Sequence, residues 1–283
     1  MIIVEMDAEP VVLRYRDLER RTWGDEQTGR LADWFYADDA DLNLNIVGMP
    51  PNGSAIESPA NPTIFGADEL FYVLEGVMVQ SNPVTGEVFV VKPGEAIFFR
   101  KDTWHYQWNY SNSQLRMLEF FQPAPKSGTG GSYARAQPPR PNAPKQGQDE
   151  LLGNWPMARD LPREKTTWMI HEHDILWRIE GTVRGREILV GILASTEHMT
   201  VGKMSFLGGQ RSCDYVHNGE KVLFVETGNL HVEFPGTKKW VELEPFDGLR
   251  IPAGVKHSFY NMSQDPATCL FSTAVDYAPG CIG

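Results

Sequence analysis

An internal repeat restricts the folds available to this chain more than any other feature of its sequence. Three pairs of landmark residues share one separation in residue number (228 − 76 = 152 for the glycines): Gly76 and Gly228, His105 and His257, and Asn109 and Asn261. A looser echo upstream relates the segment that begins at Val11 to the segment that begins at Thr167. A separation that holds at three points without a gap indicates one structural unit encoded twice.

The repeated unit has the composition of short β-strands. Residues 70–80 and 222–232 are rich in β-branched and aromatic side chains, and a glycine interrupts each segment. Residues 88–99 and 240–251 add further short apolar runs that are bounded by turn-forming residues. Many short strands with little helical periodicity predict an antiparallel barrel or sandwich. We therefore expect an all-β protein that contains two tandem antiparallel barrels.

A change of composition separates the two halves. Residues 122–148 are rich in Pro, Gly and polar residues and nearly free of aliphatic side chains, so they cannot build a core of their own. We predict an N-terminal barrel over residues 1–122, a linker or arm over 123–154 and a C-terminal barrel over 155–283.

Charge and composition exclude several classes of function. The 26 basic and 37 acidic side chains give a net charge of −11 without a basic stripe, so we expect no nucleic-acid partner. No apolar run approaches the roughly 20 residues of a membrane span, and the N-terminus does not have the pattern of a secretory signal. Three cysteines are too few for a disulfide framework. These features predict a soluble cytoplasmic protein with a small-molecule ligand, and the strand edges favour a homodimer.

Two spaced motifs recur in the repeat. In the second half, the first motif comprises Gly209, Tyr215-Val-His217, Lys221 and Gly228. The second motif is Pro252-Ala-Gly254-Val-Lys-His257-Ser-Phe-Tyr-Asn261. These spacings resemble the cupin superfamily, whose first motif is glycine, His-x-His, Glu and glycine, and whose second is Pro-x-Gly, His and Asn. The resemblance implies two jelly-roll-like cupin barrels, a bicupin, but it specifies no reaction because the fold supports many.

The motifs are more eroded in the first half of the chain. Only Glu69 and His105 remain of the residues that would hold a metal, and Thr63 and Phe65 occupy the positions of the His-x-His pair. Because two ligands seldom hold a catalytic ion, we interpret this barrel as a mainly structural partner. A Glu–His pair in a pocket would still be able to perform acid–base chemistry.

In the second half the resemblance implies a metal site formed by side chains that alternate into the barrel. His217 and His257 match two ligand positions, whereas Tyr215 replaces the first His and Lys221 replaces the Glu. A bulge at the preceding turn would point Glu220 inward instead of Lys221. His217, Glu220 and His257 would then form a two-His-one-carboxylate set that suits Fe(II), and also Mn, Ni or Zn. Without a bulge, the Lys221 ammonium faces the site and repels a divalent ion.

Three functions remain open at this stage. The resemblance favours a metal-dependent enzyme, a non-haem Fe(II) dioxygenase acting on an aromatic or hydroxylated acid, with Tyr215 or Lys221 orienting or protonating the intermediate. The second function is an isomerase, lyase or dehydratase in which Tyr215, Lys221 and His217 supply acid and base, with zinc or without metal. The third is a non-catalytic barrel that binds a small molecule.

Overall fold

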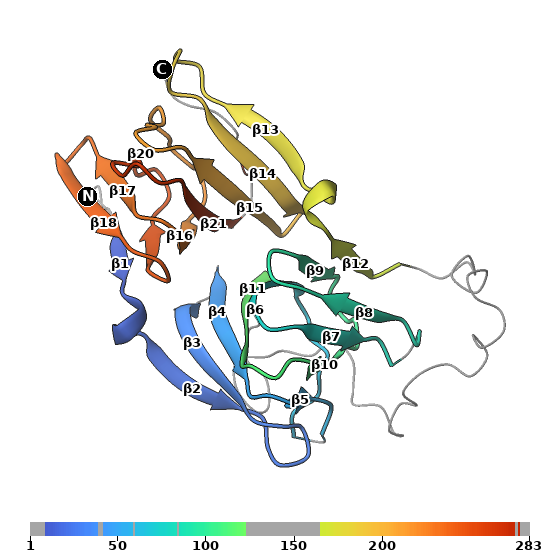
Figure 1. Cartoon of the computed structure of the whole chain (residues 1–283). Helices are drawn as coiled ribbons and strands as arrows, with labels where there is room; N and C mark the ends of the chain where they lie inside the picture. The colour runs from blue at the N-terminus through green and yellow to red at the C-terminus, as the bar shows by residue number, and fades with distance from the viewer. Residues whose placement is uncertain are drawn as a thin grey trace, which may run out of the picture. The chain divides into compact units, whose positions relative to one another are not determined.

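The computed structural model describes residues 9–38, 42–58, 60–83, 85–122, 165–274 and 277, and their regular structure is almost entirely antiparallel β (Figure 1). This confirms the predicted all-β class. The linker or arm predicted over residues 123–154 lies outside the described residues. No helix in the described part of the chain is long and apolar enough to cross a membrane.

Two sheets form the N-terminal barrel. In spatial order, the seven-stranded sheet contains β12 (Thr167–Ile170), β9 (Ala96–Phe99), β6 (Asp68–Glu75), β11 (Leu115–Gln122), β4 (Asn43–Met49), β3 (Leu31–Asp38) and β2 (Glu19–Trp23). The four-stranded sheet contains β5 (Ser54–Ala55), β10 (Tyr106–Asn109), β7 (Met78–Ser81) and β8 (Val88–Val91). Inward-facing residues of both sheets, such as Phe71 and Phe99, build one hydrophobic core.

The C-terminal barrel repeats this arrangement. Its seven-stranded sheet contains, in spatial order, β1 (Val11–Leu13), β19 (Gly248–Ile251), β16 (Lys221–Thr227), β21 (Ala267–Ala274), β15 (Met199–Phe206), β14 (Ile188–Ser195) and β13 (Leu176–Glu180). The smaller sheet contains β18 (Lys239–Leu243), β17 (Leu230–Phe234) and β20 (Ser258–Tyr260). Short 3₁₀ helices, η1 (Tyr15–Asp17) and η4 (Glu172–Asp174), follow β1 and β12. A second core includes Leu223, Phe259 and Phe271.

Strand pairing preserves the repeat in three dimensions. Glu69 pairs with Phe99 on one side and with Phe121 on the other. Lys221 pairs with Ile251 and Thr273, which are the residues 152 positions later. Glu69 and Lys221 therefore occupy the same place in their barrels, as the motif spacing predicts.

The boundaries of the two barrels differ from the continuous ranges 1–122 and 155–283. Strand β1 pairs with β19 and belongs to the C-terminal barrel, whereas β12 pairs with β9 and belongs to the N-terminal barrel. The compact units are accordingly discontinuous in sequence: 1–19, 35–44 and 174–283 form one, and 20–34 and 45–173 form the other. Each exchanged strand covers a sheet edge that would otherwise leave its N–H and C=O groups unpaired.

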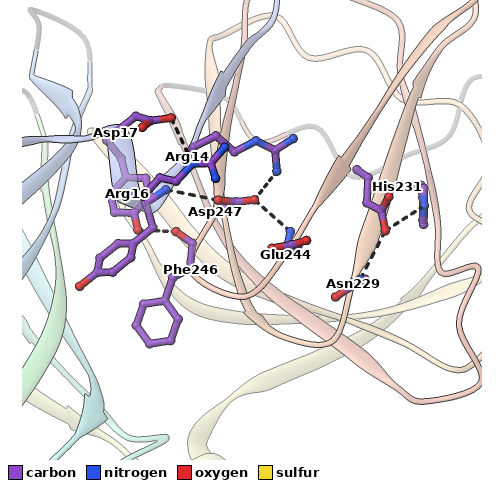
Figure 2. A network of polar contacts seen from close by, with 11 residues as sticks. Arg14, Arg16, Asp17, Asn229, His231, Glu244, Phe246 and Asp247 are labelled. Atoms are coloured by element: carbon purple, nitrogen blue, oxygen red, sulfur yellow. Dashed lines mark hydrogen bonds and ion pairs between the residues drawn. The ribbon is translucent and has the colours of Figure 1, made fainter.

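An acidic side chain fixes the turn that follows each exchanged strand. Figure 2 shows Asp247, which pairs with Arg14 and also accepts a hydrogen bond from the backbone N–H of Glu244 at 3.1 Å. In the N-terminal barrel, Glu95 contacts His171 Nδ1 at 2.7 Å. Of the sequence pair His171 and His173, His171 therefore contacts Glu95, and the ring of His173 stacks on that of His171 with centroids 5.2 Å apart.

Phe246 occupies the position that Gly94 holds in the first half, 152 residues earlier. Its φ of +72° lies in the left-handed region, and so does the φ of +86° at Gly94, its counterpart in the first half. A phenylalanine is costly in this conformation. Its ring packs against Phe224, with ring centroids 5.6 Å apart, and against Tyr15 at 5.4 Å. This aromatic packing offsets the backbone cost and secures the turn that carries Asp247 (Figure 2).

Candidate functional site

The C-terminal barrel brings together four of the five predicted site residues of this half. The backbones of Tyr215 and His257 form a two-way hydrogen-bonded bridge, with N···O distances of 2.7 and 3.0 Å. His217 follows two residues later on the same face, and the ring centroids of His217 and His257 are 5.6 Å apart. Lys221 opens β16 and is 2% exposed. Alternation along these extended segments explains why the four side chains converge.

Lys221 points into the barrel. Its Nζ lies 3.3 Å from His217 Nε2 and 4.5 Å from the ring centroid of Phe271. Lys221 shares a face with Leu223 and Val225, which belong to the hydrophobic core of this barrel. A buried ammonium that contacts an imidazole and aromatic rings is placed to bind an oxyanion.

Glu220 does not join this group. Both of its carboxylate oxygens accept hydrogen bonds from Arg250, with Arg250 Nη2 at 2.8 Å. The expectation that a bulge turns Glu220 inward is therefore not met by the structure. Because the side chains alternate regularly into β16, Lys221 points inward. The neighbouring Glu220 points the other way and binds the guanidinium of Arg250 on β19.

The residues present do not fit the divalent metal that the cupin resemblance implies. Within the described ranges, no group of three or more His, Cys, Asp and Glu side chains is arranged to hold an ion. His217 and His257 remain as two imidazole donors, and the third position is taken by the Lys221 side chain, 3.3 Å from His217. A cation at that place opposes a second cation, and no carboxylate offsets the charge.

Burial keeps both imidazoles neutral. It lowers the pKa of His217 to about 2, with further contributions from Lys221 and His257. Burial, together with Lys221, lowers the pKa of His257 to about 3. Burial also lowers the pKa of Lys221 to about 8. The site therefore offers neutral bases and a lysine that titrates slightly above neutrality.

Hydrogen bonding defines which atom of His257 is available. Its Nδ1 lies 2.9 Å from the carbonyl oxygen of Val255, so Nδ1 carries the proton and donates it. The lone pair of Nε2 is buried and has no hydrogen-bond partner among the described residues. The hydroxyl of Tyr215 is likewise buried and without a hydrogen-bond partner in the described structure. An acceptor and a donor are thus left without a hydrogen-bond partner in the described part of this barrel.

Two further residues of this site were missed by sequence reasoning. The Tyr277 hydroxyl contacts both carboxylate oxygens of Glu180 at 2.8 Å, and its ring stacks on His217 with centroids 6.0 Å apart. Neither residue belongs to a cupin motif. The only signal for Glu180 was an acidic residue in a segment with strand composition.

The N-terminal barrel brings Glu69 and His105 together. Glu69 Oε2 lies 3.3 Å from His105 Nε2, and both side chains are buried. Sequence analysis missed Asp33 and Glu119, which lie on strands outside the motifs and are also buried in this barrel. The expectation of a mainly structural barrel did not anticipate this concentration of ionisable groups.

Comparison with known proteins identifies the family. The model of the family described as "Cupin domain" matches residues 45–121 and 202–273, one region in each barrel. The chain belongs to the cupin family. Its two matched regions make it a bicupin, as the repeat predicts. A search among curated proteins finds no match.

Solved bicupin-like structures resemble this cupin over nearly its whole length. A putative glyoxylate-induced protein from Pseudomonas aeruginosa has a TM-score of 0.65 and 16% identity, covering 100% of this chain and 95% of that one. Oxalate decarboxylase from Lactobacillus farciminis gives 0.62 and 13%, covering 97% and 89%. Salicylate 1,2-dioxygenase from Pseudaminobacter salicylatoxidans gives 0.61 and 11%, covering 96% and 86%. At these identities the likeness establishes the fold alone.

Proposed function

We propose that the C-terminal barrel catalyses metal-independent proton transfer on a small carbonyl compound, as an isomerase, lyase or dehydratase does. One observation carries this proposal: Lys221 occupies the position of the motif carboxylate and lies 3.3 Å from His217. The site then combines a cationic oxyanion binder with the buried, unpartnered lone pair of His257 Nε2. These are the groups that proton abstraction next to a carbonyl requires.

The proposed reaction begins with the C–H bond adjacent to the substrate carbonyl. His257 Nε2 takes this proton, and the electron pair of the C–H bond moves to the carbonyl oxygen to form an enolate. The Lys221 ammonium and the Tyr215 hydroxyl stabilise the enolate oxygen. Where the α-carbon carries a hydroxyl group, the hydroxyl proton passes to the enolate oxygen and the C–H proton returns to the former carbonyl carbon, which gives the isomeric carbonyl compound. Departure of a β-substituent with the electron pair of its bond to carbon gives elimination instead.

His217 and the Tyr277–Glu180 pair have positioning roles in this scheme. His217 Nε2 accepts a hydrogen bond from Lys221 and so fixes the direction of the amine. The ring of Tyr277 stacks on the ring of His217, and the Tyr277 hydroxyl donates a hydrogen bond to Glu180. Because neutral imidazole and phenol add no charge beside Lys221, an anionic substrate oxygen remains the best partner for its ammonium.

Proton exchange in D₂O tests the proposal without knowledge of the natural substrate. A panel of 2-oxo and 2-hydroxy acids is incubated with the protein, and loss of the C–H signal is followed by NMR. We expect exchange with at least one compound, and a decrease of about 10²–10⁴-fold in His257→Ala and Lys221→Met. His198→Ala, which changes a histidine outside the barrel interior, is the matched control and retains the rate.

The iron-dependent dioxygenase expected from the motifs remains the second candidate. The two inward imidazoles, and the fold shared with a salicylate 1,2-dioxygenase, favour it, whereas the inward Lys221 opposes it. Mass spectrometry of metal content decides between the two. About one iron per chain in the wild type, lost in His257→Ala together with chelator-sensitive activity, would overturn the metal-independent proposal. Ligand binding without exchange or turnover would instead indicate the non-catalytic barrel.

A further inference from the structure

The interior of the N-terminal barrel holds ionisable side chains that the proposed function does not use. We name them the acidic cluster, which consists of Asp33 on β3, Glu69 on β6, Glu119 on β11 and His105 before β10. Glu69 and Glu119 share a hydrogen bond. Asn45 on β4 donates a hydrogen bond from Nδ2 to Glu119 Oε2 at 2.8 Å. The three acids and Asn45 therefore come from four strands of one sheet, and His105 precedes β10 of the other sheet.

The hydrogen bonds show where a proton is held. His105 Nδ1 lies 3.0 Å from the carbonyl oxygen of Thr103 and donates to it, so His105 Nε2 is an acceptor. Glu69 Oε2 lies 3.3 Å from Nε2, and burial raises the pKa of Glu69 so that its carboxyl group holds a proton and is neutral. The ring of His105 stacks on Phe99 with centroids 4.6 Å apart, which fixes its orientation.

A cavity borders this cluster. Its volume is about 30 Å³, which is room for a small polar head group rather than for a whole metabolite. Its lining combines carboxyl groups with aromatic walls and comprises Trp23, Leu31, Asp33, Val47, Ala55, Thr63, Phe65, Phe71, His105, Gln107 and Glu119. None of these described lining residues is a lysine or an arginine.

Comparison with the other barrel shows that this arrangement is not a general feature of the repeat. Glu69 corresponds to Lys221, and Glu119 corresponds to Phe271, each 152 residues later. The same two positions thus carry two acids in one barrel, and a base that rests on an aromatic ring in the other. At these two positions the repeat is therefore conserved in geometry but not in chemistry.

Two buried oxygens of this barrel have no hydrogen-bond partner in the described structure, and one of them, on Thr63, lines the cavity. Thr63 is 3% exposed, lines the cavity, and its Oγ1 has no hydrogen-bond partner among the described residues. Glu69 Oε1 is also buried without a hydrogen-bond partner there. We propose that the acidic cluster is a binding site for the ammonium group of a small organic amine, which would donate hydrogen bonds to Thr63 Oγ1 and to the carboxyl groups of Asp33 and Glu119 in the cavity lining. The aromatic walls suit such a cation as well.

The protonation of the empty cluster agrees with this assignment. Burial raises the pKa of Asp33 to about 7 and, together with the nearby Asp33, that of Glu119 to about 8. Burial and Glu119 raise the pKa of Glu69 well above its usual value. The exposed Arg21 of β2 acts in the opposite direction, because its positive charge lowers the pKa of Asp33. A bound ammonium would favour the carboxylate forms, so binding should release protons and strengthen as the pH rises.

Thermal unfolding and titration calorimetry of the full chain test the site with n-propylammonium chloride. We expect this amine to raise Tm in phosphate buffer, and to do so more at pH 8 than at pH 5.5. Neutral n-propanol, which has the same length, and propionate, which has the opposite charge, should leave Tm unchanged at matched ionic strength.

Two variants connect the effect to the cluster. Asp33→Asn and Glu119→Gln preserve the shape of the protonated acids, so we expect both to fold and to bind the amine at least tenfold more weakly. Glu75→Gln is the matched control, because Glu75 ends the same strand as Glu69 but is half exposed and pairs with Arg116. This control should bind as the wild type does.

The opposite results would overturn the proposal. Equal effects of propylammonium and propanol would show that the cavity recognises no charge. Stabilisation by Mn²⁺ but not by the amine would assign the carboxyl groups to a metal. An absence of any ligand effect, with unchanged Glu119→Gln behaviour, would leave the cluster with a structural role. None of these outcomes depends on the reaction proposed for the C-terminal barrel.

Discussion

At the scale of single residues, position 221 determines which chemistry the C-terminal barrel can perform. A lysine there faces His217 and His257, where the family motif has a glutamate. The motif spacing located this position correctly. It did not decide between Glu220 and Lys221, because one inserted residue would reverse the alternation and no sequence signal distinguishes a bulged turn from a regular one.

Replacement of this lysine should create the missing metal site. We expect Lys221→Glu to bind about one divalent ion per chain, since the new carboxylate would join two imidazoles whose ring centroids are 5.6 Å apart. Mass spectrometry after growth with added Mn²⁺ or Fe²⁺ measures this gain. Lys221→Gln, which removes the charge without adding a ligand, is the control and should remain without metal. An equal metal content in both variants would contradict the prediction.

The buried acid Glu119 should make stability depend on pH. Its pKa is about 8 in the folded protein, above the ordinary value of 4.5, so the native state binds more protons than the unfolded one. Its stabilising contribution is then complete below pH 4.5 and is lost as the pH rises through 8. We expect Glu119→Gln to flatten this part of the curve of unfolding free energy against pH, measured by urea denaturation. A slope equal to that of the wild type would contradict this assignment.

At the scale of elements, the repeat predicted most of the strands but not their exchange. The echo between the segments at Val11 and Thr167 was visible in the sequence and corresponds to β1 and β12. Which barrel each strand completes depends on where the edges of β9 and β19 become available in space. The composition of the two segments does not indicate which barrel each strand joins. The buried residues Glu180 and Asp33 escaped detection for a related reason, since they lie on strands without motif spacing.

The contact that secures β1 should contribute measurably to stability. Asp247 is nearly buried, pairs with Arg14 and accepts backbone hydrogen bonds from Tyr15 and Glu244 (Figure 2). We expect Asp247→Ala to lower the free energy of unfolding by about 1–3 kcal/mol, because it leaves these donors unsatisfied. Chemical denaturation measures the loss.

The exposed acid Asp17 provides the comparison. Its ion pair with Arg16 is open to solvent on both sides, and such pairs contribute little. Asp17→Ala should therefore change the free energy of unfolding by less than about 0.5 kcal/mol. Equal losses in Asp17→Ala and Asp247→Ala would show that the turn after β1 does not depend on the buried carboxylate.

At the scale of the whole molecule, we propose that the chain forms a homodimer through an apolar face of β13 and β14. Ile179 pairs across the strands with Leu189, and Trp177 lies on the same face; all three are exposed. Large apolar side chains gathered on one sheet face are typical of an interface. A second copy of the chain is the expected partner, because strand edges had already favoured a homodimer.

Light scattering after size-exclusion chromatography tests this assembly. Ile179→Glu should convert a dimer to a monomer, since a carboxylate would be buried without a partner at the interface. Met262→Glu changes an exposed apolar residue that follows β20 of the smaller sheet, and it should leave the mass unchanged. A wild-type protein that is already monomeric would contradict the proposal.

The repeat places an acid, Glu69, in one barrel and a base, Lys221, at the corresponding position of the other, and this difference can be exchanged by mutation. Both residues share one strand register, with corresponding neighbouring strands, yet one is an acid and the other is a base. Reciprocal exchange of the two residues would therefore place a lysine in the N-terminal barrel and a glutamate in the C-terminal barrel, at the same strand register. A single substitution at this register would then be enough to shift the preference of one barrel from cations to anions, or the reverse.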